Sequence, residues 1–293
     1  MKSLYSQTAF NCSKLITNAY STSFSLGIKT LNKKYHEPIY AIYGFVRYAD
    51  EIVDTFHDHD KKALLTQFKD DTHKAIEEGI SLNPVLHSFQ EVVNEYQIDY
   101  HLIEAFLASM EMDLSKKNYS DSEYKKYIYG SAEVVGLMCL KVFSEGDDEY
   151  YQSLLEPAKS LGSAFQKVNF LRDIKSDYDE RGRVYFPGVN FPNFNTKDKQ
   201  EIEEDIRIDF QNSLIGIRNL PEGVRSGVYL AYMYYTVLFK KITQLSPETI
   251  KTKRIRIPDI KKLLLWIKSY FFHKLLLGKL QHKSAHVSFM INE

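Results

Sequence analysis

"LGSAFQKVNFLRDIKSDYDERGRVYFP", residues 161–187, decides the fold class because its apolar and polar residues repeat with the period of an α-helix. Asp173 and Asp177 are four residues apart and therefore share one face of that helix. Asn169 and Gln166 extend this face toward the N-terminus at spacings of four and three residues. The positions around them are apolar, namely Phe165, Val168, Phe170, Leu171 and Ile174. A polar stripe on an apolar helix predicts buried polar groups that need a partner or a metal ion.

A second pair of aspartates lies in "GFVRYADEIVDTFHDHD", residues 44–60. Asp50 and Asp54 are also four apart, and like charges at this spacing destabilise a helix by roughly 0.2–0.5 kcal/mol. A bound cation would offset that repulsion. Two aspartate pairs and the Asn169 oxygen suit Mg²⁺, with Mn²⁺ as the alternative, because Mg²⁺ binds few carboxylates and completes its shell with water and phosphate oxygens.

An arginine adjoins each aspartate pair. Arg47 precedes Asp50 and Arg172 precedes Asp173, so two fork-shaped donors are available to the same phosphates. A single pair of this kind is more often a solvated helix face, whereas two pairs on apolar helices favour a shared metal and phosphate site. More acids and imidazoles follow Asp54. We expect these to form the exposed end of that helix rather than a separate metal site: His57, Asp58, His59 and Asp60.

Composition limits the classes of function. The 293 residues include 38 basic and 38 acidic side chains, so the net charge gives no reason to expect a nucleic-acid partner. Two cysteines favour a reducing compartment without a disulfide framework. The N-terminal residues do not resemble a signal peptide, and the most apolar stretch, residues 263–280, is interrupted by Lys268, His273 and Lys274. We expect a cytoplasmic protein without a membrane span.

Helical signals fill most of the chain. Residues 100–114 are typical, with apolar side chains recurring every three or four positions, and alternating β-type stretches are missing. The one long irregular segment is expected at residues 178–195, which are rich in Gly, Pro and Asn. Prolines are expected at helix ends, and four of them mark first turns: Pro38, Pro84, Pro221 and Pro247. One all-α domain over residues 1–293 is the simplest interpretation.

These residues resemble the squalene/phytoene synthase family, the head-to-head branch of the all-α isoprenoid synthases. The resemblance covers most of the chain, and its most specific part is the second aspartate motif, with Gln-x-x-Asn before it and R-x-Y-F-P after it. The other matching stretches are "YSTSFSLGIKTL" (20–31), "YAIYGFVRYADEIVD" (40–54) and "YIYGSAEVVGLM" (127–138). The resemblance implies a single-domain helical bundle with a central cavity.

The resemblance also assigns roles to individual residues. It implies that Asp50, Asp54, Asp173 and Asp177 are catalytic and hold Mg²⁺ together with Asn169. It implies contacts to diphosphate or prenyl chain from a second set: Ser21, Ser23, Tyr43, Arg47, Gln166, Arg172 and Tyr235. Arg254 matches a basic position near the C-terminus, after a loop that is longer here. Glu133 replaces a residue that is usually small, and could face the cavity or turn outward.

The implied reaction joins two prenyl diphosphates head to head. One diphosphate ionises, the double bond of the second attacks, and the cyclopropyl diphosphate then ionises, rearranges and loses a proton. Candidate aromatic linings for the cationic chain are Phe24, Tyr43, Tyr127, Tyr129 and Phe170, although core packing is the commoner role of such residues.

Chain length is expected to depend on Ile28 and Tyr40. Their sizes slightly favour phytoene from two geranylgeranyl diphosphates over dehydrosqualene or squalene from farnesyl diphosphate. No NADPH is expected, and no G-x-G-x-x-G sequence occurs.

Two other classes of protein remain as alternatives. An all-α metal phosphohydrolase of the HD type would use the "FHDHD" stretch, residues 56–60, but would leave the second aspartate motif unexplained. A non-catalytic helical relative that assembles with a partner would be expected to lose motif aspartates, and both pairs are present.

The C-terminal stretch suggests a membrane contact. Residues 251–283 carry ten Lys or Arg side chains and one acid, Asp259, beside a face rich in Leu and aromatic residues. This pattern is typical of a helix lying on an anionic membrane surface, although the apolar face could instead pack on the domain. We therefore expect peripheral association with the inner face of the membrane in addition to the cytoplasmic location.

Overall fold

The computed structural model describes residues 2–252 and residue 255. In these residues the chain is helical, and its only β-type pairing is an isolated bridge between Asn118 and Val184. The α-helices are α1 (Leu4–Tyr20), α2 (Thr22–Lys29), α3 (His36–Asp54), α4 (Lys61–Glu78), α5 (Pro84–Tyr96), α6 (Tyr100–Ser115), α7 (Asp121–Ile128), α8 (Val134–Ser144), α9 (Asp148–Arg181), α10 (Thr196–Asn219), α11 (Glu222–Thr243) and α12 (Pro247–Thr252). Short 3₁₀ turns occur at Lys33–Tyr35 and Phe191–Asn193, and a π-helical turn at Tyr129–Glu133. The predicted all-α class is confirmed.

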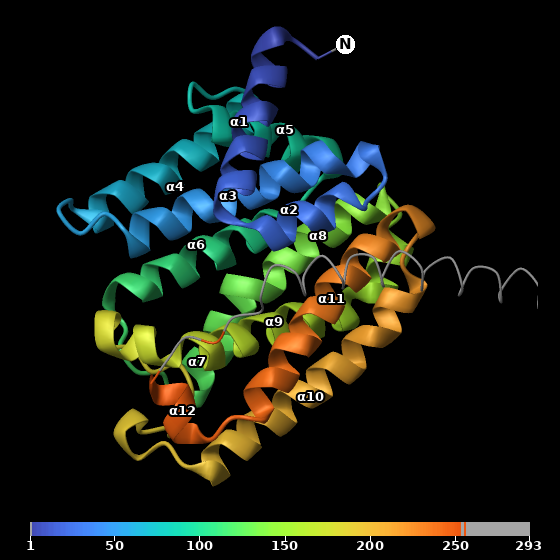
Figure 1. The fold of residues 1–293 in the computed structure, drawn as a ribbon. Helices are drawn as coiled ribbons and strands as arrows, with labels where there is room; N and C mark the ends of the chain where they lie inside the picture. The colour runs from blue at the N-terminus through green and yellow to red at the C-terminus, as the bar shows by residue number, and fades with distance from the viewer. Residues whose placement is uncertain (1, 253–254, 256–293) are drawn as a thin grey trace, which may run out of the picture.

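The helices form two packed groups that meet along α8 and α9 (Figure 1). In the first group, α3 packs against α1, α4, α5 and α6, around a core in which Phe45 stacks on Phe89 with ring centroids 3.9 Å apart. In the second group, α9 packs against α10, α11 and α12, around a core that includes Phe170 and Phe210. This arrangement places α3 in the first group and α9 in the second, so each group carries one of the two aspartate motifs.

Helix α9 is 34 residues long and carries the second motif. It starts at the Asp147 cap, whose side chain accepts a hydrogen bond from Tyr150 N, and it ends where Gly182 adopts a left-handed φ of 64°. The irregular segment expected from residue 178 therefore begins later than predicted, because residues 178–181 continue the helix. The continuation matters for the site, since it places Arg181 one turn beyond Asp177 on the same face.

Proline placement follows the prediction at four positions and departs from it at one. Pro38, Pro84, Pro221 and Pro247 lie in the first turns or caps of α3, α5, α11 and α12. Pro157 instead lies inside α9, where the ring removes one backbone hydrogen bond. Helix α10 comes close at this point, because a Cβ atom on its Gly216 would lie only 2.4 Å from Pro157 Cβ.

The π-helical turn brings α9 close to its neighbours. A Cβ on Gly162 of α9 would lie 2.8 Å from the Ala132 carbonyl oxygen, so only glycine allows this approach. Similarly, a Cβ atom on Gly130 would lie 2.4 Å from the Ala105 carbonyl oxygen of α6. Such π-helical turns are frequent at functional sites. Here the turn places Ser131 within reach of the polar stripe on α9.

None of the described helices is long and apolar enough to cross a bilayer. The basic C-terminal stretch and the single-domain assignment over residues 1–293 extend into residues 253–254 and 256–293, which lie outside the described part of the chain. Both stay predictions.

Candidate active site

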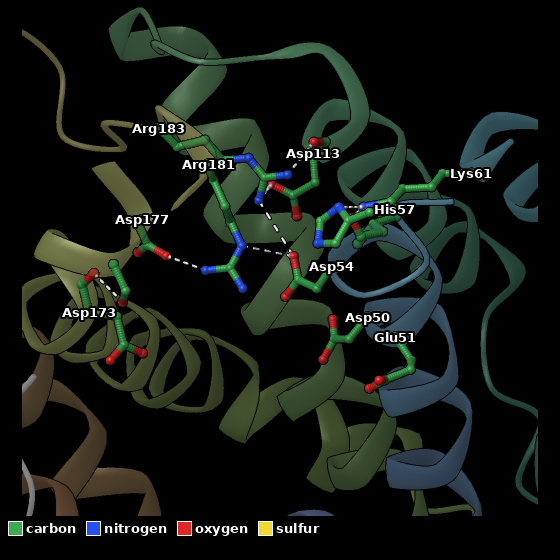
Figure 2. A network of polar contacts seen from close by, with 12 residues as sticks. Asp50, Glu51, Asp54, His57, Lys61, Asp113, Asp173, Asp177, Arg181 and Arg183 are labelled. Atoms are coloured by element: carbon green, nitrogen blue, oxygen red, sulfur yellow. Dashed lines mark hydrogen bonds and ion pairs between the residues drawn. The ribbon is translucent and has the colours of Figure 1, made fainter. Parts of the chain in front are cut away.

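The two aspartate pairs lie across from one another, with Arg181 between them (Figure 2). Its Nε atom is 3.4 Å from Asp54 Oδ1 on α3, and its Nη1 donates to Asp177 Oδ1 on the same helix at 3.0 Å. One guanidinium therefore links the pair on α3 to the pair on α9. This arrangement follows from the two helices: each pair occupies one face because of its spacing of four, and the two faces point into the same space.

The carboxylates of this site are crowded and partly desolvated. Desolvation raises the pKa of Asp50 to about 7, Arg47 opposes the shift, and Asp54 adds to it, although 35% of the Asp50 side chain remains accessible. Desolvation also raises the pKa of Asp177 to about 7, with Asp173 adding to the shift. Burial is the main cause of both shifts, and a further positive charge beside these carboxyl groups would favour their ionised form.

The two arginines predicted to bind phosphate are each bonded to a carboxylate, Arg172 to the motif residue Asp173 and Arg47 to Glu51. Arg172 makes two parallel hydrogen bonds to Asp173, from Nε to Oδ1 at 3.0 Å and from Nη2 to Oδ2 at 2.5 Å. Arg47 Nη2 donates a close hydrogen bond to Glu51 Oε2, and Arg47 Nη1 lies 4.0 Å from Asp50 Oδ2. The Arg47 guanidinium also lies over the Tyr20 ring, with Cζ 4.3 Å from the ring centroid. Both guanidinium groups therefore stand beside the aspartates, where an incoming phosphate could take them as partners.

A line of polar side chains crosses the site from α11 to the π-helical turn. Tyr235 OH donates to Asn169 Oδ1 at 3.2 Å, and Asn169 Nδ2 donates to Gln166 Oε1 at 3.4 Å. Gln166 Nε2 in turn donates to Ser131 Oγ at 3.2 Å. The amide end of the predicted stripe, Gln166 and Asn169, is thus hydrogen-bonded in series, and the Asn169 amide oxygen accepts the bond from Tyr235.

Of the residues predicted near the N-terminus, Tyr43 on α3 lies near Arg47, Asp50 and Tyr235, and Ser21 lies beside Tyr43. Ser21 caps α2 by accepting a hydrogen bond from Phe24 N at 3.2 Å, so part of its role is structural. Tyr43 has its pKa raised by burial, with a hydrogen bond to Ser21 opposing the shift, and its ring lies 5.5 Å from Phe24. Ser23 lies in the first turn of α2. Arg254 lies outside the described residues.

Three residues of the site were not predicted from the sequence, namely Arg181, Arg183 and Asp113. Arg183 Nη1 lies 3.3 Å from Asp113 Oδ1 and 3.7 Å from Asp54 Oδ1, and Tyr127 OH donates to Asp113 Oδ2 at 2.7 Å. Desolvation raises the pKa of Asp113 to about 6, with Arg183 opposing the shift. Arg183 is the arginine of R-x-Y-F-P, and Arg181 stands four residues after Asp177, so both had a sequence signal. Asp113 had none, since it lies on α6, far along the chain.

A pocket of about 200 Å³ opens beside Arg181 and Arg183. Its lining contains more bases than acids. The charged and imidazole side chains around it are Asp54, His57, Lys61, Asp113, Lys116, Lys117, Glu180, Arg181 and Arg183. Lys61 Nζ donates to the Val53 carbonyl at 2.9 Å and lies 3.0 Å from His57 Nδ1. An anion could enter this pocket next to the aspartates.

Within the described residues, no three His, Cys, Asp or Glu side chains are close enough to hold a metal ion. The cause is visible in the ion pairs, because Asp54, Asp173 and Asp177 are each turned toward an arginine. The donor set still fits Mg²⁺: four carboxylates, two of them with raised pKa values, and an amide oxygen are the hard ligands that this ion prefers.

Comparison with known proteins agrees with this geometry. A sequence model of squalene/phytoene synthases matches residues 17–261. The chain belongs to the squalene/phytoene synthase family. The resemblance inferred from the motifs is therefore confirmed, and the family together with the names of its members indicates a prenyltransferase-type enzyme.

Two curated relatives illustrate the similarity. The 4,4'-diapophytoene synthase of Staphylococcus haemolyticus is 28% identical over 193 residues, which are 65% of this chain and 66% of that protein, so the match spans about two thirds of the relative. The phytoene synthase of Arthrospira platensis is 26% identical over 283 residues, covering 87% of this chain and 90% of that protein. A crystal structure of a dehydrosqualene synthase in complex with ligand superimposes with a TM-score of 0.77 at 23% identity, over 92% of this chain and 98% of that one, which shows a shared fold.

The outcome for the remaining sequence predictions is mixed. Helix α3 ends at Asp54, so residues 57–60 form an exposed connection rather than the end of the helix, and Asp60 caps α4. The HD-type alternative is answered by the family match over residues 17–261, which includes both aspartate pairs. The charges that influence Glu133, a half-buried side chain, come from Lys159, Lys167, Asp209 and Glu156 and not from the motif aspartates. Glu133 therefore faces the contact between α9 and α10.

Proposed function

We propose that the chain catalyses the Mg²⁺-dependent head-to-head condensation of two geranylgeranyl diphosphates to phytoene, through a cyclopropyl diphosphate. One observation carries the proposal: the aspartate pairs of α3 and α9 face each other across a single guanidinium, with two more arginines beside them. A site of this kind accepts a ligand that brings both cations and phosphate oxygens. Members of the family use a divalent metal to bind diphosphate, which agrees with that donor set.

Bound Mg²⁺ would supply the positive charge that a departing diphosphate needs. Asp50, Asp54, Asp173 and Asp177, with Asn169 Oδ1, would hold it, and Mn²⁺ would suit the same oxygen ligands. Arg47 and Arg172 would exchange their carboxylate partners for phosphate oxygens, which they can bind in the same bidentate manner. Tyr235 would keep the Asn169 amide in the orientation that presents its oxygen.

The apolar chain and the developing cation need surroundings that exclude water. Tyr43 and Phe24 lie together at the α2–α3 end of the site, and Tyr235 stacks on Phe165 with ring centroids 4.0 Å apart. Aromatic faces of this kind attract a cation by about 0.5–2 kcal/mol each. The condensation requires no protein nucleophile, since the second prenyl double bond forms the new carbon–carbon bond. It requires no NADPH, since the rearranged cation is neutralised by loss of a proton.

The proposed chain length of the substrate is inferred from two buried residues and from the relatives. Ile28 and Tyr40 are almost fully buried on α2 and α3, with 3% and 2% of their surfaces accessible. A medium-sized residue at position 28 favours the longer, forty-carbon product, and the phytoene synthase of Arthrospira platensis aligns with most of the chain. Farnesyl diphosphate and a thirty-carbon product are the alternative, which the similarity to a diapophytoene synthase favours.

The test is direct incubation of the purified chain with Mg²⁺ and labelled geranylgeranyl or farnesyl diphosphate, followed by organic extraction and chromatography. We expect a labelled forty-carbon hydrocarbon and two equivalents of inorganic diphosphate, unchanged when NADPH is added and lost in chelator. A thirty-carbon product alone would transfer the proposal to farnesyl diphosphate. No hydrocarbon from either substrate would contradict an enzymatic function and favour the non-catalytic alternative.

A further inference from the structure

Arg181 differs from its neighbours in linking the two aspartate pairs. Its guanidinium reaches Asp54 at 3.4 Å and Asp177 at 3.0 Å, one carboxylate from each pair (Figure 2). Arg172 pairs with Asp173 of the second pair, and Arg183 reaches Asp54 of the first pair while also bonding to Asp113 and Tyr185. Arg181 thus occupies the space between the carboxylates that a shared cation would need.

A positive side chain in that space opposes a metal ion in two ways. It holds the Asp54 and Asp177 oxygens in hydrogen-bonding directions, and its charge repels a second cation a few ångströms away. Repulsion between two cations at such distances is substantial in a partly buried site, because the effective dielectric there is well below that of water. A free divalent ion therefore meets carboxylates that already have a counter-ion.

The pocket beside Arg181 offers the guanidinium another partner. Arg181, Arg183, Lys61 and Lys117 all line it, and Asp54 stands at its edge. A planar guanidinium matches two phosphate oxygens as well as it matches a carboxylate. A diphosphate arriving at this border could draw Arg181 away from the aspartates.

We propose that Arg181 makes binding of the divalent cation depend on diphosphate. Without diphosphate, Arg181 neutralises Asp54 and Asp177 and weakens cation binding. With diphosphate, its guanidinium bonds to phosphate oxygens and frees both carboxylates for the metal. Arg181 is in this sense a positioning residue, and the inference rests on the proposed metal site of the preceding section.

A purely structural role makes different predictions. If Arg181 only ties the end of α9 to α3, its loss lowers the melting temperature and weakens binding of cation and diphosphate alike. The coupling role instead predicts shifts of opposite sign, because the lost charge helps the cation and harms the anion.

The experiment compares Arg181→Gln with the wild-type chain in two binding measurements. Mn²⁺ alone is titrated by electron paramagnetic resonance, and labelled inorganic diphosphate in chelator is titrated by equilibrium dialysis. We expect Arg181→Gln to bind Mn²⁺ at least about fivefold tighter and diphosphate at least about fivefold weaker, the lower end of typical coupling between sites. Arg181→Lys keeps the positive charge but loses the planar pair of donors that binds two phosphate oxygens. Its Mn²⁺ affinity should therefore stay within about twofold of wild type, while its diphosphate binding weakens.

Lys175→Gln is the matched control, since Lys175 pairs with Asp179 four residues later on the same helix and touches neither aspartate pair. It should leave both affinities unchanged. Equal or weaker Mn²⁺ binding by Arg181→Gln, with wild type binding both ligands, would overturn the inference and leave the proposed function intact. Failure of wild type to bind Mn²⁺ and diphosphate when the two are supplied together would overturn both the inference and the proposed function.

Discussion

Tyr235 on α11 donates a hydrogen bond to Asn169 Oδ1 on α9, across 3.2 Å. The contact orients the amide oxygen that is proposed to join the metal ligands, while the Tyr235 ring is held separately by stacking on Phe165. Helix α11 therefore contacts the proposed metal site through the Tyr235 hydroxyl group.

Tyr235→Phe tests this relationship, because it removes the hydroxyl and keeps the stacked ring. A hydrogen bond of this type contributes about 0.5–1.5 kcal/mol, so we expect kcat/KM to fall by roughly two- to twelvefold with little change in melting temperature. Steady-state turnover and thermal melts measure the two quantities. Tyr232→Phe, one turn earlier on α11, serves as the control and should retain its activity. Full activity in Tyr235→Phe would show that the Asn169 orientation does not depend on this bond.

Glu133 gives a pH-dependent prediction away from the aspartates. Desolvation raises its pKa from 4.5 to about 7, so the folded chain binds this proton more tightly than the unfolded chain does. The free energy of unfolding contributed by Glu133 therefore falls as the pH rises from about 4.5 to about 7, and stays lower above that range. Glu133→Gln removes the penalty.

We expect Glu133→Gln to melt above wild type at about pH 8 and to lose most of that advantage at about pH 5, where the wild-type carboxyl is largely protonated in the folded state. Thermal melts of both proteins across this range measure the difference. Glu78→Gln, at the exposed end of α4, is the control and should show a constant offset. A Glu133→Gln advantage that grows toward low pH would show that the sign is wrong.

Ile28 provides a prediction about product length. Ile28→Phe adds bulk at a position that is 3% exposed, and if this side chain bounds the prenyl-binding space, product should shift from forty toward thirty carbons. Chromatography of products from mixed geranylgeranyl and farnesyl diphosphates measures the ratio. Ile76→Phe adds the same bulk on α4, which packs against α3, α5 and α6, and should leave the ratio unchanged. An unaltered ratio in Ile28→Phe would place the end of the prenyl chain elsewhere.

The basic C-terminal stretch predicts binding to anionic vesicles. Each Lys or Arg near such a surface contributes on the order of 1 kcal/mol, and salt screens this attraction. We expect co-sedimentation with anionic vesicles at low salt, release at high salt, and loss of binding when residues 269–293 are deleted. Neutral vesicles are the control. Binding that survives the deletion would assign the contact to another surface.

The sequence was sufficient for those features of the site that depend on helical spacing alone. A separation of four residues puts Asp50 with Asp54, and Asp173 with Asp177, on single helix faces, and the structure places these faces opposite each other. The family motif gave Gln166 and Asn169 as their neighbours, and these amides are hydrogen-bonded in series.

Other features depend on tertiary contacts that no local pattern encodes. Asp113 reaches the site because α6 packs against α3, and its partner Arg183 arrives from a segment 70 residues later. The last turn of α9 was expected to be irregular because glycine and proline are frequent after it, yet the helix continues to Gly182. Arg181 owes its position between the aspartates to that additional turn.

The most direct test of the account is the turnover of Asp54→Asn and Asp173→Asn, one substitution in each pair, with saturating Mg²⁺ and labelled geranylgeranyl diphosphate. Asp179→Asn is the matched control, because Asp179 lies on the same helix as Asp173 but pairs with Lys175 outside the site. Loss of an electrostatic partner of the transition state typically costs 10²-fold or more, so we predict at least about a 100-fold loss in each motif variant, with circular dichroism unchanged and Asp179→Asn fully active. Retention of more than about a tenth of the wild-type rate by either motif variant would contradict a reaction that depends on both aspartate pairs.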